Sequence, residues 1–210
     1  MAETILGIQY ATREQHREAV TLGMWAFLAT EVLFFGSLIA AYLNYRIWFG
    51  NELIAAARHT KIVLGTANTA ILLTSSACMA MAVMTREAGG RRAPVLWLLA
   101  TAALGLAFVV VKGTEYFLEY QEHLVPALNF DLSHYSGTGE IFFVWYFCAT
   151  GLHALHLLIG IGMVLWLAMR IGSDRLESPS ATRLIGLYWH FVDVVWIFLF
   201  PLIYLAGRNG

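Results

Sequence analysis

The sequence predicts an all-α, polytopic membrane protein with five transmembrane helices. Of its 210 residues, 59% are hydrophobic and only 13% are charged, which is far from the composition of a soluble domain. Apolar runs of about 20 residues recur, and each is long enough to cross a bilayer as a helix. The alternating ten-residue segments of a transmembrane barrel do not occur. The net charge of −1 and the lack of a basic stripe exclude a nucleic-acid partner.

The first two spans are expected at residues 20–45 and 62–84. Glu31 lies near the middle of the first span. The second carries small polar residues, which in membranes usually mark contacts between helices. These residues are Asn68, Thr69, Thr74, Ser75 and Ser76. Cys78 and Cys148 lie in separate apolar runs, so we expect both to pack between helices as free thiols.

The remaining spans are expected at residues 93–122, 140–169 and 184–206. The third span turns polar at its end, where Pro126 is expected to stop the helix. Pro201 should kink the last span because it removes a backbone donor. The linkers are short, so residues 1–210 are expected to form a single transmembrane domain.

The distribution of Lys and Arg predicts that the N-terminus is cytoplasmic and the C-terminus outside. The polar segment before residue 20 does not resemble a secretory signal, and we expect it to stay in the mature protein. With this orientation, eight basic residues fall on the inner side: Arg13, Arg17, Arg86, Arg91, Arg92, Arg170, Arg175 and Arg183. Four fall on the outer side: Arg46, Arg58, Lys61 and Arg208.

Ionisable residues inside the spans are the main functional candidates, because a charge at the bilayer centre costs roughly 2.5–3.5 kcal/mol. They are Glu31, His153, His156, His190 and Asp193. Three interpretations remain open: a metal or haem site at His153 and His156, a proton relay, and a set of paired polar groups that fix helix packing or line a lipid cleft. Structural zinc needs four ligands, and only two are local here. Ser75 and Ser76 lack the glycine-flanked motif of a serine nucleophile.

Two further groups lie near the ends of the spans. Glu115 and Glu119 are one turn apart, and we expect them to form an outer acidic surface, either solvated or docked against a partner subunit or a cation. Arg170 closes the fourth span at the inner face, where it suits the helix C-terminus and a lipid headgroup. His16 and Arg17 lie on the same side and are expected to join Arg170 there.

Four motifs make the chain resemble subunit III of the haem–copper cytochrome c oxidases, in its shorter five-helix bacterial form. They are Gly23-Met24 followed by Glu31 to Phe35; Glu115-Tyr116 with Glu119-Tyr120; Thr150-Gly151-Leu152-His153 continuing to His156; and Tyr188 to Trp196. The resemblance covers nearly everything from Leu22 to Leu205. It implies a helical bundle with a cleft that holds phospholipid. Many members of the family have seven helices, and this chain begins at the equivalent of the third.

The resemblance also implies the roles of individual residues. Glu31, His153 and His156 would be interior residues near the lipid cleft, and Arg170 would hold a lipid phosphate. Trp189, His190, Asp193 and Trp196 would pack the last helix against its neighbours.

The function implied is that of a non-catalytic subunit of a proton-pumping terminal oxidase in a bacterial plasma membrane. No metal or redox centre is expected in this chain, because haem and copper belong to partner subunits. Partners would be catalytic subunit I, subunit II, membrane phospholipids and a larger respiratory supercomplex. The subunit would support proton uptake and protect the catalytic subunit. Rival interpretations are a quinol oxidase subunit, a nitric oxide reductase helper and a stand-alone proton or ion transporter.

Overall fold

The computed structural model describes residues 12–58, 60–126, 128, 137–173 and 179–206, and these form helices without any strand. The elements are α1 (Arg13–Ala57), α2 (Ile62–Glu87), α3 (Arg92–Gln121), α4 (Gly137–Gly172), α5 (Ser180–Phe200) and the π-helical turn η1 (Pro201–Leu205). All five α-helices are long and apolar enough to cross a membrane. The prediction of an all-α fold with five transmembrane helices is therefore confirmed.

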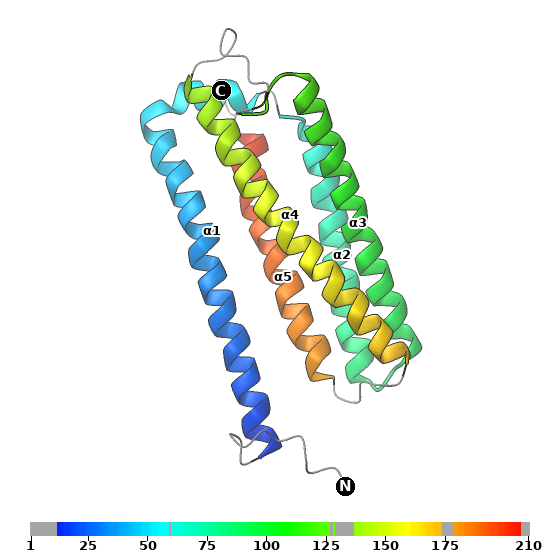
Figure 1. Cartoon of the computed structure of the whole chain (residues 1–210). Helices are drawn as coiled ribbons and strands as arrows, with labels where there is room; N and C mark the ends of the chain where they lie inside the picture. The colour runs from blue at the N-terminus through cyan, green and yellow to red at the C-terminus, as the bar shows by residue number, and fades with distance from the viewer. Residues whose placement is uncertain (1–11, 59, 127, 129–136, 174–178, 207–210) are drawn as a thin grey trace.

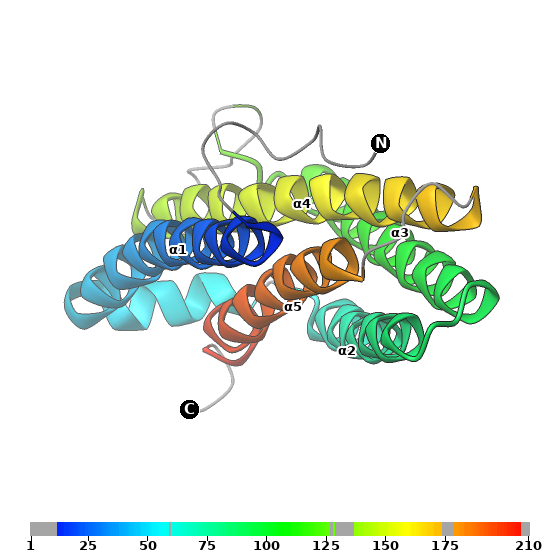
Figure 2. The same ribbon diagram turned by 90° about the horizontal axis from the view of Figure 1, so that it is seen from below.

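The helices run alternately up and down, so α1, α3 and α5 begin at the end of the bundle where α2 and α4 finish (Figure 1). Viewed along the bundle axis, α5 lies between α1 and α2 (Figure 2). Helix α4 runs along one side of the bundle, where it contacts α1, α3 and α5. Among the described elements, helix α1 packs mainly on α4 and α5, with a smaller contact to η1. Half of the most apolar stretch of α5 is buried, against 17% for α1. Helix α5 is therefore the central helix, and α1 is the most exposed.

Helix α1 continues twelve residues beyond its predicted end at residue 45. Its path breaks at Phe49, whose backbone is non-helical (φ −126°, ψ 31°), and the segment after it turns across the end of the bundle (Figure 1). The turned segment buries Leu53, Ala56 and Ala57. Hydropathy alone suggests a loop here, because the segment is too polar to be a membrane span and only one face of the helix is buried.

The turns that follow α2 and α3 each contain a residue with a positive φ angle. Gly89 (φ 83°) ends α2, and the amides of Gly89 and Gly90 donate to the carbonyls of Arg86 and Thr85, both at 3.0 Å. This hydrogen-bond pattern is a Schellman motif, in which glycine avoids Cβ strain. Helix α3 ends in the same way at His123 (φ 57°). The expectation that Pro126 stops α3 was wrong, because the helix is already capped at Glu122.

Pro201 marks the point where α5 changes into the π-helical turn η1. The carbonyl oxygens of this turn accept hydrogen bonds from other elements. Tyr42 OH donates to the Leu202 oxygen (3.1 Å), and Thr60 Oγ1, which donates to the Ala57 oxygen at 2.7 Å, also lies 3.5 Å from the Ile203 oxygen. Leu202 and Ile203 lie in the last helical turn, whose carbonyls have no partner within a helix, and hydroxyl groups from α1 and from the turn after α1 approach them instead.

Tryptophan side chains of α5 fill the centre of the bundle. Trp189 is fully buried and packs between two glycines, since a Cβ on Gly105 would lie 2.9 Å from its Cη2 and one on Gly160 would lie 3.2 Å from its Cε3. Trp196 is 1% exposed, and its Nε1 donates to Thr69 Oγ1 at 3.0 Å. These contacts bring α2, α3 and α4 together around α5.

Candidate functional site

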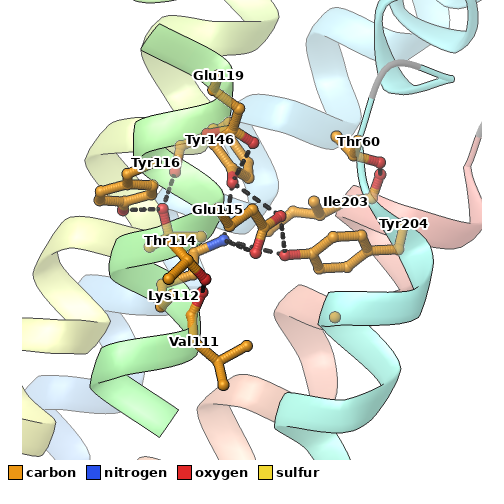
Figure 3. A network of polar contacts seen from close by, with 12 residues as sticks. Thr60, Val111, Lys112, Thr114, Glu115, Tyr116, Glu119, Tyr146, Ile203 and Tyr204 are labelled. Carbon is orange, nitrogen blue, oxygen red and sulfur yellow. Dashed lines mark hydrogen bonds and ion pairs between the residues drawn. The ribbon is translucent and has the colours of Figure 1, made fainter. Parts of the chain in front are cut away.

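A buried polar network joins α3, α4 and η1 near the end of the bundle where α5 finishes (Figure 3). At its centre is Lys112, whose side chain is 3% exposed. Lys112 Nζ donates to Glu115 Oε2 (3.1 Å), Tyr146 OH (2.7 Å) and Tyr204 OH (2.9 Å). An ammonium has three N–H donors, so this arrangement satisfies all of them inside the bundle. We refer to Lys112, Glu115, Glu119, Tyr146 and Tyr204 as the lysine network.

The two tyrosines of the lysine network also donate hydrogen bonds to its carboxyl groups. Tyr204 OH donates to Glu115 Oε1 at 2.7 Å, and Tyr146 OH donates to Glu119 Oε1 at 2.6 Å. The ammonium also lies 4.5 Å from the centroid of the Tyr146 ring, within the range of a cation–π contact. Each hydroxyl therefore accepts from Lys112 and donates to a carboxyl group, so that tyrosines of α4 and η1 are tied to ionisable side chains that all lie on α3.

The expectation that Glu115 and Glu119 form an outer acidic surface was wrong. Both side chains are 0% exposed. Inside the bundle, Glu115 pairs with Lys112 and accepts from Tyr204, and Glu119 accepts from Tyr146, because buried polar groups need hydrogen-bond partners. A lysine in an apolar run, three residues before a glutamate, was the sequence signal for this pair. The tyrosine partners carried no comparable signal.

Glu31 and His156 form a second polar pair, between α1 and α4. The distance from His156 Nε2 to Glu31 Oε2 is 3.2 Å, and His156 Nδ1 lies 2.8 Å from the Leu152 carbonyl oxygen. A carbonyl accepts only, so Nδ1 must carry a proton. The contact at Nε2 then contains one proton, held by either the imidazole or the carboxyl. With exposures of 16% and 18%, this pair lies at the edge of the bundle.

His153 does not share this site, although it is only three residues from His156. It is 1% exposed and packs edge-on against Phe108, with ring centroids 5.5 Å apart, and beside Trp196 at 5.1 Å. Neither of its ring nitrogens has a hydrogen-bond partner among the described residues. The two histidines therefore face different neighbours, His153 towards α3 and α5 and His156 towards α1.

His190 and Asp193 do not pair with each other in the structure. His190 Nδ1 lies 2.7 Å from Ser76 Oγ on α2. Asp193 is 3% exposed, and its carboxyl group also interacts with Ser76. Both residues lie on the central helix, where His190 connects α5 to α2.

The basic residues at the opposite end of the bundle separate into two places. Arg170 lies over the ring of Trp166 on its own helix, 5.6 Å from the centroid. His16 and Arg17 instead line a cavity of about 840 Å³ between the first turns of α1 and α5, together with Arg183. Arg170 is not among the described residues that line this cavity. The expected grouping of Arg170 with His16 and Arg17 around one lipid headgroup stays a prediction.

Across the described ranges, no three or more His, Cys, Asp or Glu side chains are grouped so that they could hold a metal ion. The sites found are instead a charged network, a polar pair at the bundle edge and a cavity lined by charges. These arrangements hold charges and position helices.

Comparison with known proteins gives a consistent set of relatives. The family model for "Cytochrome c oxidase subunit III" matches residues 7–208. Cytochrome c oxidase subunit 3 of Thermostichus vulcanus is 30% identical over 98% of this chain and 95% of its own length. "Probable quinol oxidase subunit 3" of Staphylococcus epidermidis is 30% identical over 93% of each chain. "Heme-copper oxidase subunit I+III" of Aeropyrum pernix is 29% identical over 90% of this chain and 23% of its own length.

Proposed function

Because the chain belongs to the cytochrome c oxidase subunit III family, we propose that it is the non-catalytic third subunit of a proton-pumping terminal oxidase. The observation that carries this proposal is the family match over residues 7–208, which includes all five membrane helices. Haem and copper would be held by partner subunits, and this chain would contribute structure and lipid contacts. It would do so as part of aerobic electron transport.

The first partner proposed is the catalytic subunit I. In the relative from Aeropyrum pernix, subunits I and III are named as one protein, and the match occupies 23% of it. Two subunits that can share a polypeptide must lie close together in the assembled enzyme. We propose subunit II and a larger respiratory supercomplex as further partners, because they would belong to the same assembled enzyme.

The electron donor is either cytochrome c or a quinol. Relatives named for each type are equally similar to this chain, at 30% identity. This similarity favours neither, because the donor site would lie on other subunits. The quinol oxidase therefore remains the second candidate within the family.

We propose a lipid contact at the edge of the bundle beside the Glu31–His156 pair. Both side chains are partly exposed at the seam between α1 and α4, in spans that face the membrane. Arg170, at the inner end of α4, would hold a phosphate of that lipid. His153 would support the same wall from inside, since it packs against α3 and α5. Any effect on proton uptake would then be indirect, through the position of the catalytic subunit.

The proposed location is a bacterial plasma membrane, with the N-terminus in the cytoplasm. The structure places the starts of α1, α3 and α5 at one end, as this topology requires (Figure 1). The charge count that favours it uses two residues outside the described ranges, Arg175 and Arg208.

Affinity purification from detergent-solubilised membranes tests the proposed function. An affinity-tagged chain should retain subunit I with its haem absorbance and copper. A chain that purifies without these subunits and carries protons across liposome membranes would instead be a stand-alone transporter. A haem band in the spectrum of the isolated chain would overturn the assignment of redox centres to partners.

A further inference from the structure

We propose that Glu119 is an exchangeable proton-binding site within the lysine network (Figure 3). Glu119 lies in the last turn of α3, at the end of the bundle where α5 also finishes. In the orientation proposed above, this end faces the outside. The proposal adds a site to the chain itself, and it does not depend on the catalytic subunits.

The lysine network contains two carboxyl groups and one ammonium group. Lys112 supplies one positive charge, whereas Glu115 and Glu119 would supply two negative charges if both were ionised. Lys112 is 3% exposed and both glutamates are 0% exposed, so water does not shield the excess negative charge. A buried carboxylate without a counterion is costly, and such a group takes up a proton instead. One proton on the two glutamates makes the network neutral.

The hydrogen bonds identify Glu119 as the glutamate that takes the proton. Glu115 faces three donors: Lys112 Nζ at 3.1 Å, Tyr204 OH at 2.7 Å and Tyr146 OH at 3.2 Å. Hydrogen bonds of this kind favour the ionised form of a carboxyl group. Glu119 faces Tyr146 OH alone, at 2.6 Å from its Oε1, and its Oε2 has no hydrogen-bond partner among the described residues. Glu119 is therefore the less stabilised anion.

Tyr146 allows the proton to bind without breaking the network. Its hydroxyl accepts from Lys112 Nζ and lies within hydrogen-bonding distance of Oε1 of both Glu119 and Glu115. Without the proton, the hydroxyl donates to Glu119. When a proton from water forms an O–H bond at Oε1, Glu119 donates to the hydroxyl, which then donates to Glu115. A hydroxyl has one donor and two acceptor positions, so both arrangements are complete.

The surroundings of Glu119 give the proton a short route to water at one end of the bundle. Glu122, three residues later at the cap of α3, has a side chain that is 41% exposed. Towards the opposite end, Lys112 Nζ faces the ring of Trp196, 5.7 Å from its centroid. Glu119 therefore exchanges its proton at this end and does not pass it through the bundle. The ionisable side chains that act on Glu119 include Lys112, Glu115, Tyr116, Glu122, Tyr146 and Tyr204.

Infrared difference spectroscopy of the purified oxidase complex tests the site, because the carbonyl stretch of a protonated carboxyl group is separate from the bands of carboxylates. Glu119→Gln should remove one such band, which in the wild type is present at neutral pH and shifts in deuterated water. Glu122→Gln is the matched control and should leave the band in place, since Glu122 is exposed and paired with Lys61. An unchanged spectrum in Glu119→Gln would overturn the proposal. So would a band that does not shift in deuterated water.

Two further variants test the hydrogen-bond scheme. Tyr146→Phe should move the band to higher wavenumber, because the protonated carboxyl group loses its acceptor, and an unmoved band would contradict the two arrangements. If Glu119→Gln fails to assemble, Glu119→Asp keeps a carboxyl group and should shift the band, whereas an unshifted band would assign it to another residue. If the wild-type chain purifies without haem–copper subunits, the proposed function fails, and the same spectra of the isolated chain still test Glu119.

Discussion

At the scale of single residues, Lys112 is the most consequential side chain that the sequence left unassigned. It supplies the positive charge that lets two glutamates lie inside the bundle at 0% exposure. Replacing a buried ion pair by apolar residues of similar shape is often neutral, but removing one partner leaves an uncompensated buried charge. We therefore expect Lys112 to be essential for stability only while the carboxyl groups of Glu115 and Glu119 are present.

The first prediction concerns Lys112→Met. It should lower the free energy of unfolding by about 3–5 kcal/mol, because Glu115 loses its buried counterion. Denaturant titration in mixed micelles would measure the change. Lys61→Met is the control: Lys61 pairs with Glu122, but the two side chains are 36% and 41% exposed, so its loss should cost under about 1 kcal/mol.

The double variant Lys112→Met/Glu115→Gln should regain part of the lost stability, since it removes the unpaired charge. Equal costs for Lys112→Met and Lys61→Met would contradict the role assigned to the lysine network.

At the scale of helices, close approach at glycines decides how the elements pack. A Cβ on Gly65 of α2 would lie 2.7 Å from Cζ of Tyr204 in η1. The same tyrosine holds Glu115 and Lys112 through its hydroxyl. The distance between α2 and the end of α5 is thus linked to the geometry of the lysine network, and one methyl group is enough to disturb it.

The second prediction follows from this contact. Gly65→Ala should destabilise the protein by about 1–3 kcal/mol, because the Tyr204 ring must move off its hydrogen bonds. Gly36→Ala on α1 is the matched control, since a Cβ there meets nothing within 4 Å. Thermal unfolding of the purified protein compares the two. In a Tyr204→Leu background the effect of Gly65→Ala on stability should nearly vanish. If the loss of stability persists in that background, contact with the Tyr204 ring is not its cause.

At the scale of the whole molecule, the alternating helix directions fix two faces, and the charge distribution predicts which one is cytoplasmic. Ala88 lies in the turn between α2 and α3, and Asn51 lies beyond the kink of α1 at the opposite end. Both are exposed. These positions report the orientation without touching the polar sites.

The third prediction is that Asn51→Cys reacts with a membrane-impermeant maleimide in intact cells or spheroplasts, whereas Ala88→Cys reacts only after permeabilisation. Cys78 and Cys148 would first be replaced by alanine. The expected pattern follows from the excess of arginine on the inner side. The opposite pattern of labelling would reverse the topology and place the cavity of Arg17 and Arg183 at the outer face.

The sequence by itself determined the number and type of the membrane elements. A span in lipid must satisfy its backbone hydrogen bonds internally, so length and hydropathy suffice to identify each helix. The residue motifs also pointed to the family that the comparisons then showed. The short helix after Phe49 and the cap at His123 were missed, because both depend on local geometry that hydropathy does not record.

Only the tertiary structure decided which polar side chains meet. His153 and His156 are close in sequence, yet they face different helices, and Glu115 and Glu119 lie inside although their charges suggested a surface. Spacing along one helix gives the relative direction of its side chains, but not the rotation of that helix against its neighbours. That rotation is set by packing around Trp189 and Trp196, so the contacts that Glu31 and Lys112 make with other helices follow from segments that are distant in the sequence.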